Sequence, residues 1–412
     1  MTWSPQLIFL LQIVAMGGFA LLMGRFAVRL GQPSLLGELV AGVLLGPTVL
    51  GMLAPGVFSG LFPSTGWSVA AREGLLMLGM LFLMFVAGLE VKLATLRGVG
   101  HAVALTATAS IVVPFALGFG AAWAWPGLWL NGSEPRDPLT LALFAGTALS
   151  ISAIPVIART LLDLGLMGTR LGALIMTSAT IADVVGWALF AFIIARVRGF
   201  DEGVSPWAGL GLTLVTLPLL AAACRWGCLP LLTRLQRRHT GTSFLAAIAV
   251  TIVAASAIAE ASGSHAILGA FVAGLAVGSG LASDEGRQAH DVVYRFAVGI
   301  FAPLYFVSVG LRVDLGSHFD PALVAVVLVL ALAGKLLGAW WGGRLGGLPS
   351  REALAVGFGL NARGAMELIL ASVALEQHVI DERLYVALVV MAVVTSALGP
   401  PFLRRLSAPV TP

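Results

Sequence analysis

An aspartate lies in the middle of a long apolar segment, where an ionisable residue is costly and usually functional. This residue, Asp183, follows Thr180 by three positions, so both side chains share one face of a helix. A carboxylate in such a place binds either a small monovalent cation or a proton, but not both at once. Asp183 therefore predicts a site where a small cation competes with H⁺. The alternative is a structural aspartate held by backbone or hydroxyl groups.

A lysine lies in the middle of a second apolar segment. Lys335 is one of only two lysines in a chain whose other basic residues are arginines. A buried lysine can release its proton, whereas arginine stays charged in proteins. We therefore expect Lys335 to be either a proton carrier or a fixed counter-charge for Asp183. A side chain that extends to the membrane interface is the alternative.

Arg363 and Glu367 form a third ionisable group within an apolar segment. Their spacing of four residues lets them face each other on an intact helix. The first hypothesis is a local ion pair that stabilises this segment, and the second is direct contact between Arg363 and a substrate. The chain contains no HExxH, GxSxG or GxxxxGK[ST] motif. These absences disfavour an enzyme, and no cofactor is expected apart from transported ions.

The composition places these charges in a membrane protein. The 412 residues are 58% hydrophobic and 11% charged, with a mean hydropathy of +0.98. Soluble domains carry about 25% charged residues. A soluble enzyme, a disordered chain and a nucleic-acid-binding protein are therefore excluded, despite a sequence pI near 9.6. The lipid bilayer, and not nucleic acid, is the expected partner.

Apolar segments of about 20 residues, which cross a bilayer as helices, recur along the whole chain. We predict an all-α polytopic membrane protein with thirteen spans. They lie at 5–24, 34–53, 72–91, 101–124, 138–158, 170–195, 207–228, 242–260, 265–282, 295–311, 321–343, 352–376 and 384–403. One transmembrane domain thus covers 1–407, and 408–412 is a short tail.

The basic residues orient these spans. With the N-terminus outside, most of the 24 lysines and arginines fall in inside loops. The sequence therefore predicts an outside N-terminus and an inside C-terminus, in a bacterial inner membrane. No basic residue precedes the first span, which disfavours a cleaved signal peptide.

An internal repeat relates the two halves of the chain. Leu36–Gly42 resembles Leu268–Gly274, and Gly88–Leu93 resembles Gly310–Leu315. The second span thus matches the ninth, and the third matches the tenth. An odd offset of seven spans inverts the second copy, which is typical of secondary transporters. The predicted halves are 34–195 and 265–403. Chance similarity between glycine-rich helices is the alternative.

The same offset pairs the fifth span with the twelfth, and both contain residues that interrupt helices. Pro155 lies in the fifth, and Asn361 and Gly364 lie in the twelfth. Interrupted spans at matching positions indicate the binding site of a transporter. Hydroxyls in the fifth span, those of Thr147 and Ser152, are therefore candidate ion ligands beside Asp183. A simple proline kink is the alternative for this span.

Several segments together carry a family resemblance over nearly the whole chain. They are Gly37–Pro47, Phe82–Leu93, Thr147–Arg159, Asp183, Leu268–Gly278, Phe306–Leu315, Lys335 and Asn361–Leu370. The chain resembles the membrane domain of the monovalent cation:proton antiporters, in the Kef-type and plant cation/proton exchanger branch. This resemblance implies a homodimer with a dimerisation domain and a core that moves like an elevator. It also implies two broken helices that cross beside the ion site, with Asp183 and Lys335 in that core.

One departure from the family leaves the stoichiometry open. Electrogenic relatives carry two adjacent acids, and many electroneutral ones carry Asn-Asp, but here Ala182 precedes Asp183. The main hypothesis is a secondary active antiporter that exchanges Na⁺ or K⁺ for H⁺ by alternating access. The alternative is a sodium-coupled organic-anion symporter, in which Arg363 holds a carboxylate. A channel or a sensor is a third class. The sequence does not choose between sodium and potassium.

Overall fold

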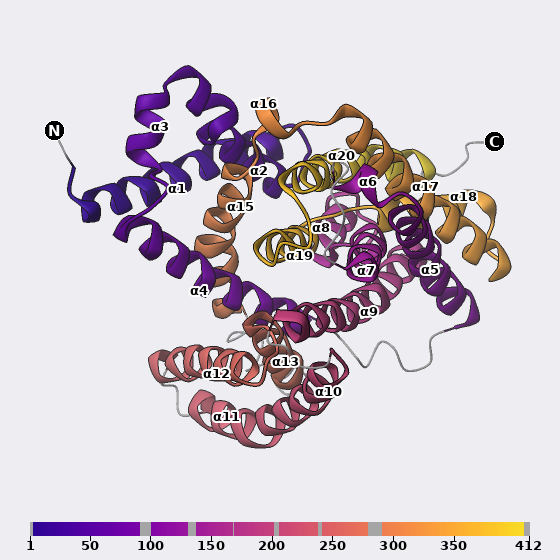
Figure 1. The fold of residues 1–412 in the computed structure, drawn as a ribbon. Coiled ribbons are helices and arrows are strands. Elements are labelled where there is room, and N and C mark those ends of the chain that lie inside the picture. The colour runs from indigo at the N-terminus through magenta and orange to yellow at the C-terminus, as the bar shows by residue number, and fades with distance from the viewer. Residues whose placement is uncertain are drawn as a thin grey trace. The chain divides into compact units, whose positions relative to one another are not determined.

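A computed structural model describes residues 3–90, 100–130, 137–167, 169–201, 206–237, 241–278 and 291–407 (Figure 1). All thirteen predicted spans contain helix. The helices are α1 (Pro5–Arg29), α2 (Ser34–Leu45), η1 (Pro47–Gly51), α3 (Pro55–Leu61), α4 (Trp67–Glu90), α5 (His101–Ala124), α6 (Pro126–Trp129), α7 (Pro138–Ser150), α8 (Ile154–Asp163), α9 (Arg170–Asp201), α10 (Pro206–Ala223), η3 (Cys224–Cys228), α11 (Leu229–Arg237), α12 (Gly241–Ala261), α13 (Ala266–Gly278), η4 (Ala297–Phe301), α15 (Ala302–Leu311), α16 (Leu315–His318), α17 (Pro321–Leu345), α18 (Ser350–Leu360), α19 (Ala365–Glu376) and α20 (Glu382–Ser407).

Ten helical segments within the described ranges are long and apolar enough to cross a membrane. The other three predicted spans are the short helix α13 and the broken pairs α7–α8 and α18–α19. A polytopic, all-helical membrane protein is therefore confirmed. The predicted tail 408–412 and the last residues of the predicted spans 72–91 and 265–282 lie outside the described residues.

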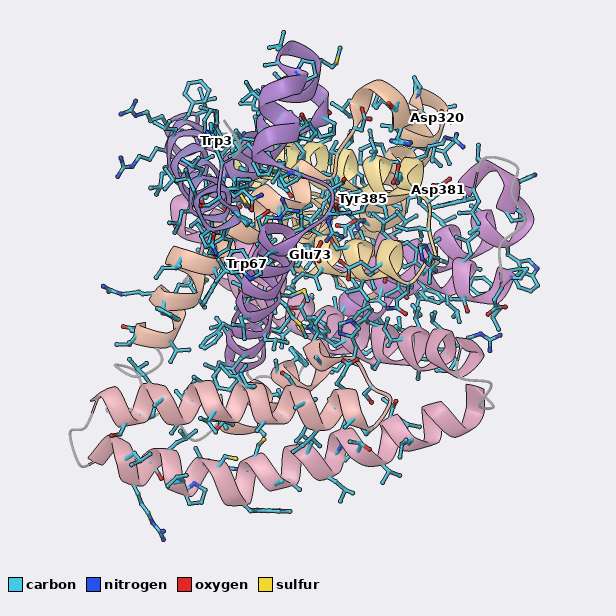
Figure 2. All side chains as sticks on the ribbon, turned by 60° about the vertical axis from the view of Figure 1, so that its left-hand side comes forward. Trp3, Trp67, Glu73, Asp320, Asp381 and Tyr385 are labelled. Carbon is cyan, nitrogen blue, oxygen red and sulfur yellow. The ribbon has the colours of Figure 1, made fainter. Side chains whose placement is uncertain are left out.

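Large apolar side chains cover the outer faces of these helices. Leu214 and Leu219 of α10 are 64% exposed and Trp226 of η3 is 78% exposed, which suits contact with lipid. Charged groups such as Asp320 and Asp381 lie at helix ends, whereas the fully buried Tyr385 lies among the helices (Figure 2).

The chain divides into two compact units. The first contains Met1–Leu21, Leu53–Leu93 and Ala191–Ser308, and the second contains Leu22–Met52, Ala94–Phe190 and Val309–Pro412. In the first unit, α13 packs against α4, α10 and α12. In the second unit, α5 packs along α7 and α17, and α18 packs against α17 and α20. All candidate site residues lie in this second unit.

The segments predicted to be repeats make equivalent close contacts. A Cβ atom at Gly88 would lie 2.2 Å from the carbonyl oxygen of Phe271 in α13. A Cβ atom at Gly310 would lie 2.3 Å from the carbonyl oxygen of Leu39 in α2. The third span (α4) thus contacts the ninth (α13) in the same way as the tenth (α15) contacts the second (α2). Only glycine permits these two approaches, which explains why the repeat is visible in the sequence.

The two predicted broken helices are present, and they meet at their breaks. Residues 151–153 separate α7 from α8, and residues 361–364 separate α18 from α19. Ser152 Oγ donates a hydrogen bond to the Leu360 carbonyl oxygen at 2.7 Å, and the Ala153 N–H donates to that of Ala362 at 2.9 Å. These bonds between residues about 200 positions apart hold the two breaks together.

The predicted helix-breaking residues differ in their positions. Asn361 is the C-cap of α18 and Gly364 the N-cap of α19, so both lie in the break. Pro155, in contrast, is the second residue of α8, just beyond the break. Proline is tolerated there because the N–H groups of a first helical turn have no partner within the helix.

Candidate functional site

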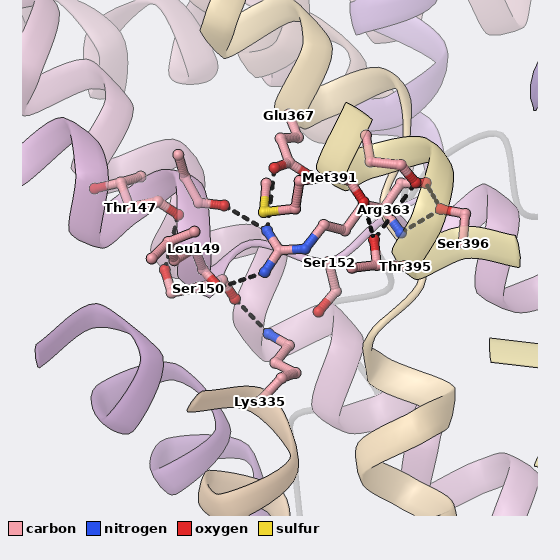
Figure 3. Close-up of polar contacts among 12 residues, drawn as sticks. Thr147, Leu149, Ser150, Ser152, Lys335, Arg363, Glu367, Met391, Thr395 and Ser396 are labelled. Carbon is pink, nitrogen blue, oxygen red and sulfur yellow. Dashed lines mark hydrogen bonds and ion pairs between the residues drawn. The ribbon is translucent and has the colours of Figure 1, made fainter. Parts of the chain in front are cut away.

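Lys335 lies on α17 and is fully buried. Its Nζ donates to the backbone carbonyl oxygen of Ser110 in α5, at 3.3 Å. It also donates to that of Ser150, the last residue of α7 (Figure 3). The close packing of α17 on α5 brings the lysine there. A Cβ atom at Gly338, one turn along α17, would lie 2.4 Å from the Ala109 carbonyl oxygen. The interface thus places Lys335 at the end of the half-helix α7.

Arg363 reaches the same end of α7 from the break between α18 and α19. Its Nη1 donates to the Ala148 carbonyl oxygen at 2.5 Å, and its Nη2 donates to that of Leu149 at 2.7 Å (Figure 3). Nη1 also lies 3.2 Å from Glu367 Oε1, and both side chains are almost completely buried. The backbone of Arg363 is fixed as well, since Ser396 Oγ accepts from its N–H and donates to its carbonyl oxygen.

Two cationic side chains therefore bind the last carbonyl groups of α7. The final carbonyls of a helix lack partners within it, and they carry the negative end of the helix dipole. Lys335 and Arg363 supply both the missing donors and the opposite charge. Sequence reasoning missed this arrangement, because no local pattern links residues 148–150 with positions 335 and 363.

Asp183 lies on α9 and is 7% exposed. Its helix contacts α18 at Ile175, whose Cδ1 would lie 2.7 Å from a Cβ atom at Gly359. Asp183 is one of three charged groups that act electrostatically on Lys335. Arg363 repels the Lys335 ammonium, and Glu367 and Asp183 attract it. The structure thus brings Lys335, Arg363 and Glu367 together at the end of α7, and Asp183 acts on Lys335 from α9.

The three predicted hydroxyl ligands are buried and donate to backbone carbonyls. Thr147 Oγ1 donates to Leu143 at 2.7 Å and Thr180 Oγ1 to Met176 at 2.9 Å, each four residues earlier in its own helix. Ser152 Oγ, as described above, joins the two breaks. Each hydroxyl donates its hydrogen to a carbonyl, so the lone pairs of its oxygen remain able to accept a hydrogen bond or to bind a cation.

The arrangement suits an alkali cation and a proton. A carboxylate, hydroxyl oxygens and backbone carbonyls are hard oxygen ligands. Two basic side chains, those of Lys335 and Arg363, lie at the end of α7 beside these ligands. Within the described ranges, no three His, Cys, Asp or Glu side chains are grouped to hold a metal ion.

This polytopic membrane protein has two broken helices that meet at their breaks, with buried charges beside them. These features define the class of secondary transporters with discontinuous helices. The family described as the sodium/hydrogen exchanger, transmembrane, matches residues 17–407. The chain belongs to this family, and the resemblance inferred from its motifs is confirmed.

Its relatives include proteins of bacteria and plants. The chain is 32% identical to the Na⁺/H⁺ antiporter NhaS4 of Synechocystis, over 98% of each chain. It is 32% identical to cation/H⁺ antiporter 19 of Arabidopsis thaliana, over 97% of this chain but 50% of the relative. It is 28% identical to the Na⁺/H⁺-K⁺ antiporter GerN of Bacillus cereus, over 93% and 92%. The chain thus spans about half the length of the plant relative.

The fold is similar to a solved structure. The sodium proton antiporter MjNhaP1 of Methanocaldococcus jannaschii superposes with a TM-score of 0.69 at 13% identity, over 98% of both chains. At this identity the likeness establishes the fold alone.

Proposed function

We propose that this protein is a secondary active antiporter that exchanges Na⁺ or K⁺ for H⁺. The observation that carries the proposal is the buried carboxylate of Asp183 on a membrane-spanning helix that contacts α18, one of the two broken helices. The names of the relatives, which are Na⁺/H⁺ and cation/H⁺ antiporters, support it.

The mechanism follows from competition at one carboxylate. From one side of the membrane the cation displaces the proton from Asp183, and on the other side a proton displaces the cation. Oxygens of Thr147, Ser152 and Thr180 assist in binding. Alternating access comes from an elevator-like movement of the second unit, with the first unit as the dimerisation domain of a homodimer. The excess of arginine in alternate loops supports an outside N-terminus in a bacterial inner membrane.

The organic-anion symporter is not supported. It requires Arg363 to bind a substrate carboxylate, but both terminal nitrogens of Arg363 already donate to α7 carbonyls, and Nη1 pairs with Glu367. The relatives named above are antiporters.

Asp183→Asn tests the proposal. An amide cannot trade a cation for a proton, so this variant should fold but lose exchange, while Asp183→Glu should keep part of it. The assay is the pH change inside proteoliposomes on addition of NaCl or KCl, with a lumenal pH-sensitive dye. Exchange at the wild-type rate by Asp183→Asn would remove Asp183 from the mechanism.

A further inference from the structure

The break between α18 and α19 contains a buried amide without a protein partner. The side chain of Asn361 is fully buried, and neither its Oδ1 nor its Nδ2 forms a hydrogen bond with any of the described residues. Burial of an amide without a hydrogen bond is costly, and such groups are rare exceptions in native proteins. Its backbone, in contrast, is paired, since the Asn361 N–H donates to the Phe358 carbonyl oxygen at 3.3 Å.

The position of Asn361 connects this amide with the crossing. The residues on either side of it, Leu360 and Ala362, accept the two hydrogen bonds from Ser152 and Ala153 that join the breaks. Asn361 therefore lies at the point where the two broken helices meet. An apolar residue would fill the same volume without the cost of desolvating an amide. The polarity of this side chain therefore calls for a reason other than the stability of the fold.

Near the same end, α18 also contacts α9, the helix that carries Asp183. The contact between Gly359 and Ile175 packs α18 on α9 two residues before Asn361. Ile175, Ala179 and Asp183 follow one another along α9 at intervals of four residues, and all three are buried. Asp183 thus lies on the same face of α9 as the residue that contacts α18, two helical turns further along the helix.

The two half-helices differ in how their C-terminal ends are neutralised. Lys335 and Arg363 bind the end of α7. At the end of α18, the donors among the described residues are neutral: the Ser152 hydroxyl and the N–H groups of Ala153 and Asn361. Within the described part of the chain, the negative end of the α18 dipole therefore has no comparable donor from a basic side chain. Ends of discontinuous helices with this polarity bind cations in transporters.

We propose that Asn361 Oδ1 is a ligand of the transported monovalent cation and sets its affinity and selectivity. This inference rests on the proposed exchange function and extends it to a residue on a second helix. An asparagine oxygen is a neutral, hard ligand of the kind that proteins offer to cations preferring oxygen. It would bind the cation together with Asp183 without adding a second negative charge.

Asn361→Leu is the primary test, because leucine has a similar volume and no polar atom. In proteoliposomes, the apparent KM for Na⁺ and for K⁺ should rise about tenfold or more, which corresponds to about 1.4 kcal/mol. The ratio of the two KM values should change, while the maximal rate changes far less. The variant should also melt at or above the wild-type temperature, since it removes an amide that no protein group satisfies.

Cation-dependent melting of the purified full chain gives a readout besides transport. A bound cation stabilises the folded state in proportion to the logarithm of its concentration above Kd. The wild-type protein should therefore melt at higher temperature as NaCl or KCl replaces choline chloride. Asn361→Leu should need about tenfold more cation for the same increase.

Gln12→Leu is the matched control. Gln12 is also a fully buried amide, but it lies on α1, and its Nε2 donates to the Leu61 carbonyl oxygen at 2.8 Å. Its replacement should lower the melting temperature and leave both KM values unchanged. Asn361→Ala, which introduces no clash, repeats the test if the leucine variant does not fold.

Two outcomes would overturn the inference. One is an unchanged KM and cation dependence of melting in a folded Asn361 variant. The other is a fall in maximal rate alone, which would make Asn361 a structural residue. A wild-type protein that exchanges no cation would instead reject the proposed function, and cation-dependent melting would still decide the role of Asn361.

Discussion

Replacement of Arg363 by methionine should destabilise the protein strongly, because three contacts depend on one guanidinium group. Arg363→Met leaves the Ala148 and Leu149 carbonyls without their cationic donor and leaves the Glu367 carboxylate buried without its partner. Removal of one member of a buried ion pair costs about 3–5 kcal/mol. Glu367→Gln should cost less, about 1–3 kcal/mol, since Arg363 keeps its two carbonyl acceptors.

The double variant separates the ion pair from the carbonyl contacts. Arg363→Met with Glu367→Gln removes both charges together, so its cost should fall about 1–3 kcal/mol below the sum of the single variants. The assay is loss of the monodisperse protein in detergent after heating, measured by size-exclusion chromatography. Arg383→Met is the control, because the Arg383–Asp320 pair is partly exposed and should contribute less than about 1 kcal/mol.

Two results would refute this reasoning. The first is Arg363→Met with the same melting temperature as Arg383→Met, which would show that the contacts at the end of α7 do not stabilise the fold. The second is strict additivity in the double variant, which would show that Arg363 and Glu367 do not act as a pair.

Further predictions concern the exchange itself. If H⁺ and the cation compete at Asp183 alone, the apparent KM should rise about tenfold per pH unit below the pKa of the site, as measured by dye dequenching from pH 6 to 9; a constant KM would contradict competition. Lys335, whose ammonium donates to two carbonyls, should remain charged through the cycle, so that one cation replaces one proton. Lys335→Arg should then retain substantial exchange, and a valinomycin clamp should change neither rate. A clamp that accelerates wild-type exchange, together with an inactive Lys335→Arg, would instead make Lys335 a proton carrier.

Much of the fold could be predicted from the sequence, because the bilayer imposes a local rule. Each span must be about 20 residues long and apolar, so its position is visible in a short window of sequence. The broken helices were also predictable, since Asn361 and Gly364 interrupt the twelfth span at a position that corresponds to the break in the fifth. The proline near the first break marks the start of α8 and not the break itself.

The candidate site was predictable in its members but not in its connections. A charge within an apolar segment is conspicuous in any sequence, so Asp183, Lys335, Arg363 and Glu367 could be named. The spacing of Arg363 and Glu367 predicted that they can face each other on an intact helix, and they do pair, although Arg363 lies in the break and only Glu367 lies in α19.

Only the tertiary structure decided what these charges contact. The bonds from Lys335 to Ser150 and from Arg363 to Leu149 join residues about 200 positions apart, and both depend on two helices ending at the same place. The Asn361 amide lacks a hydrogen-bond partner among the described residues, and this too depends on all the groups that pack around it. Hydropathy and spacing act over a few residues, whereas these contacts depend on where the ends of separate helices lie in space.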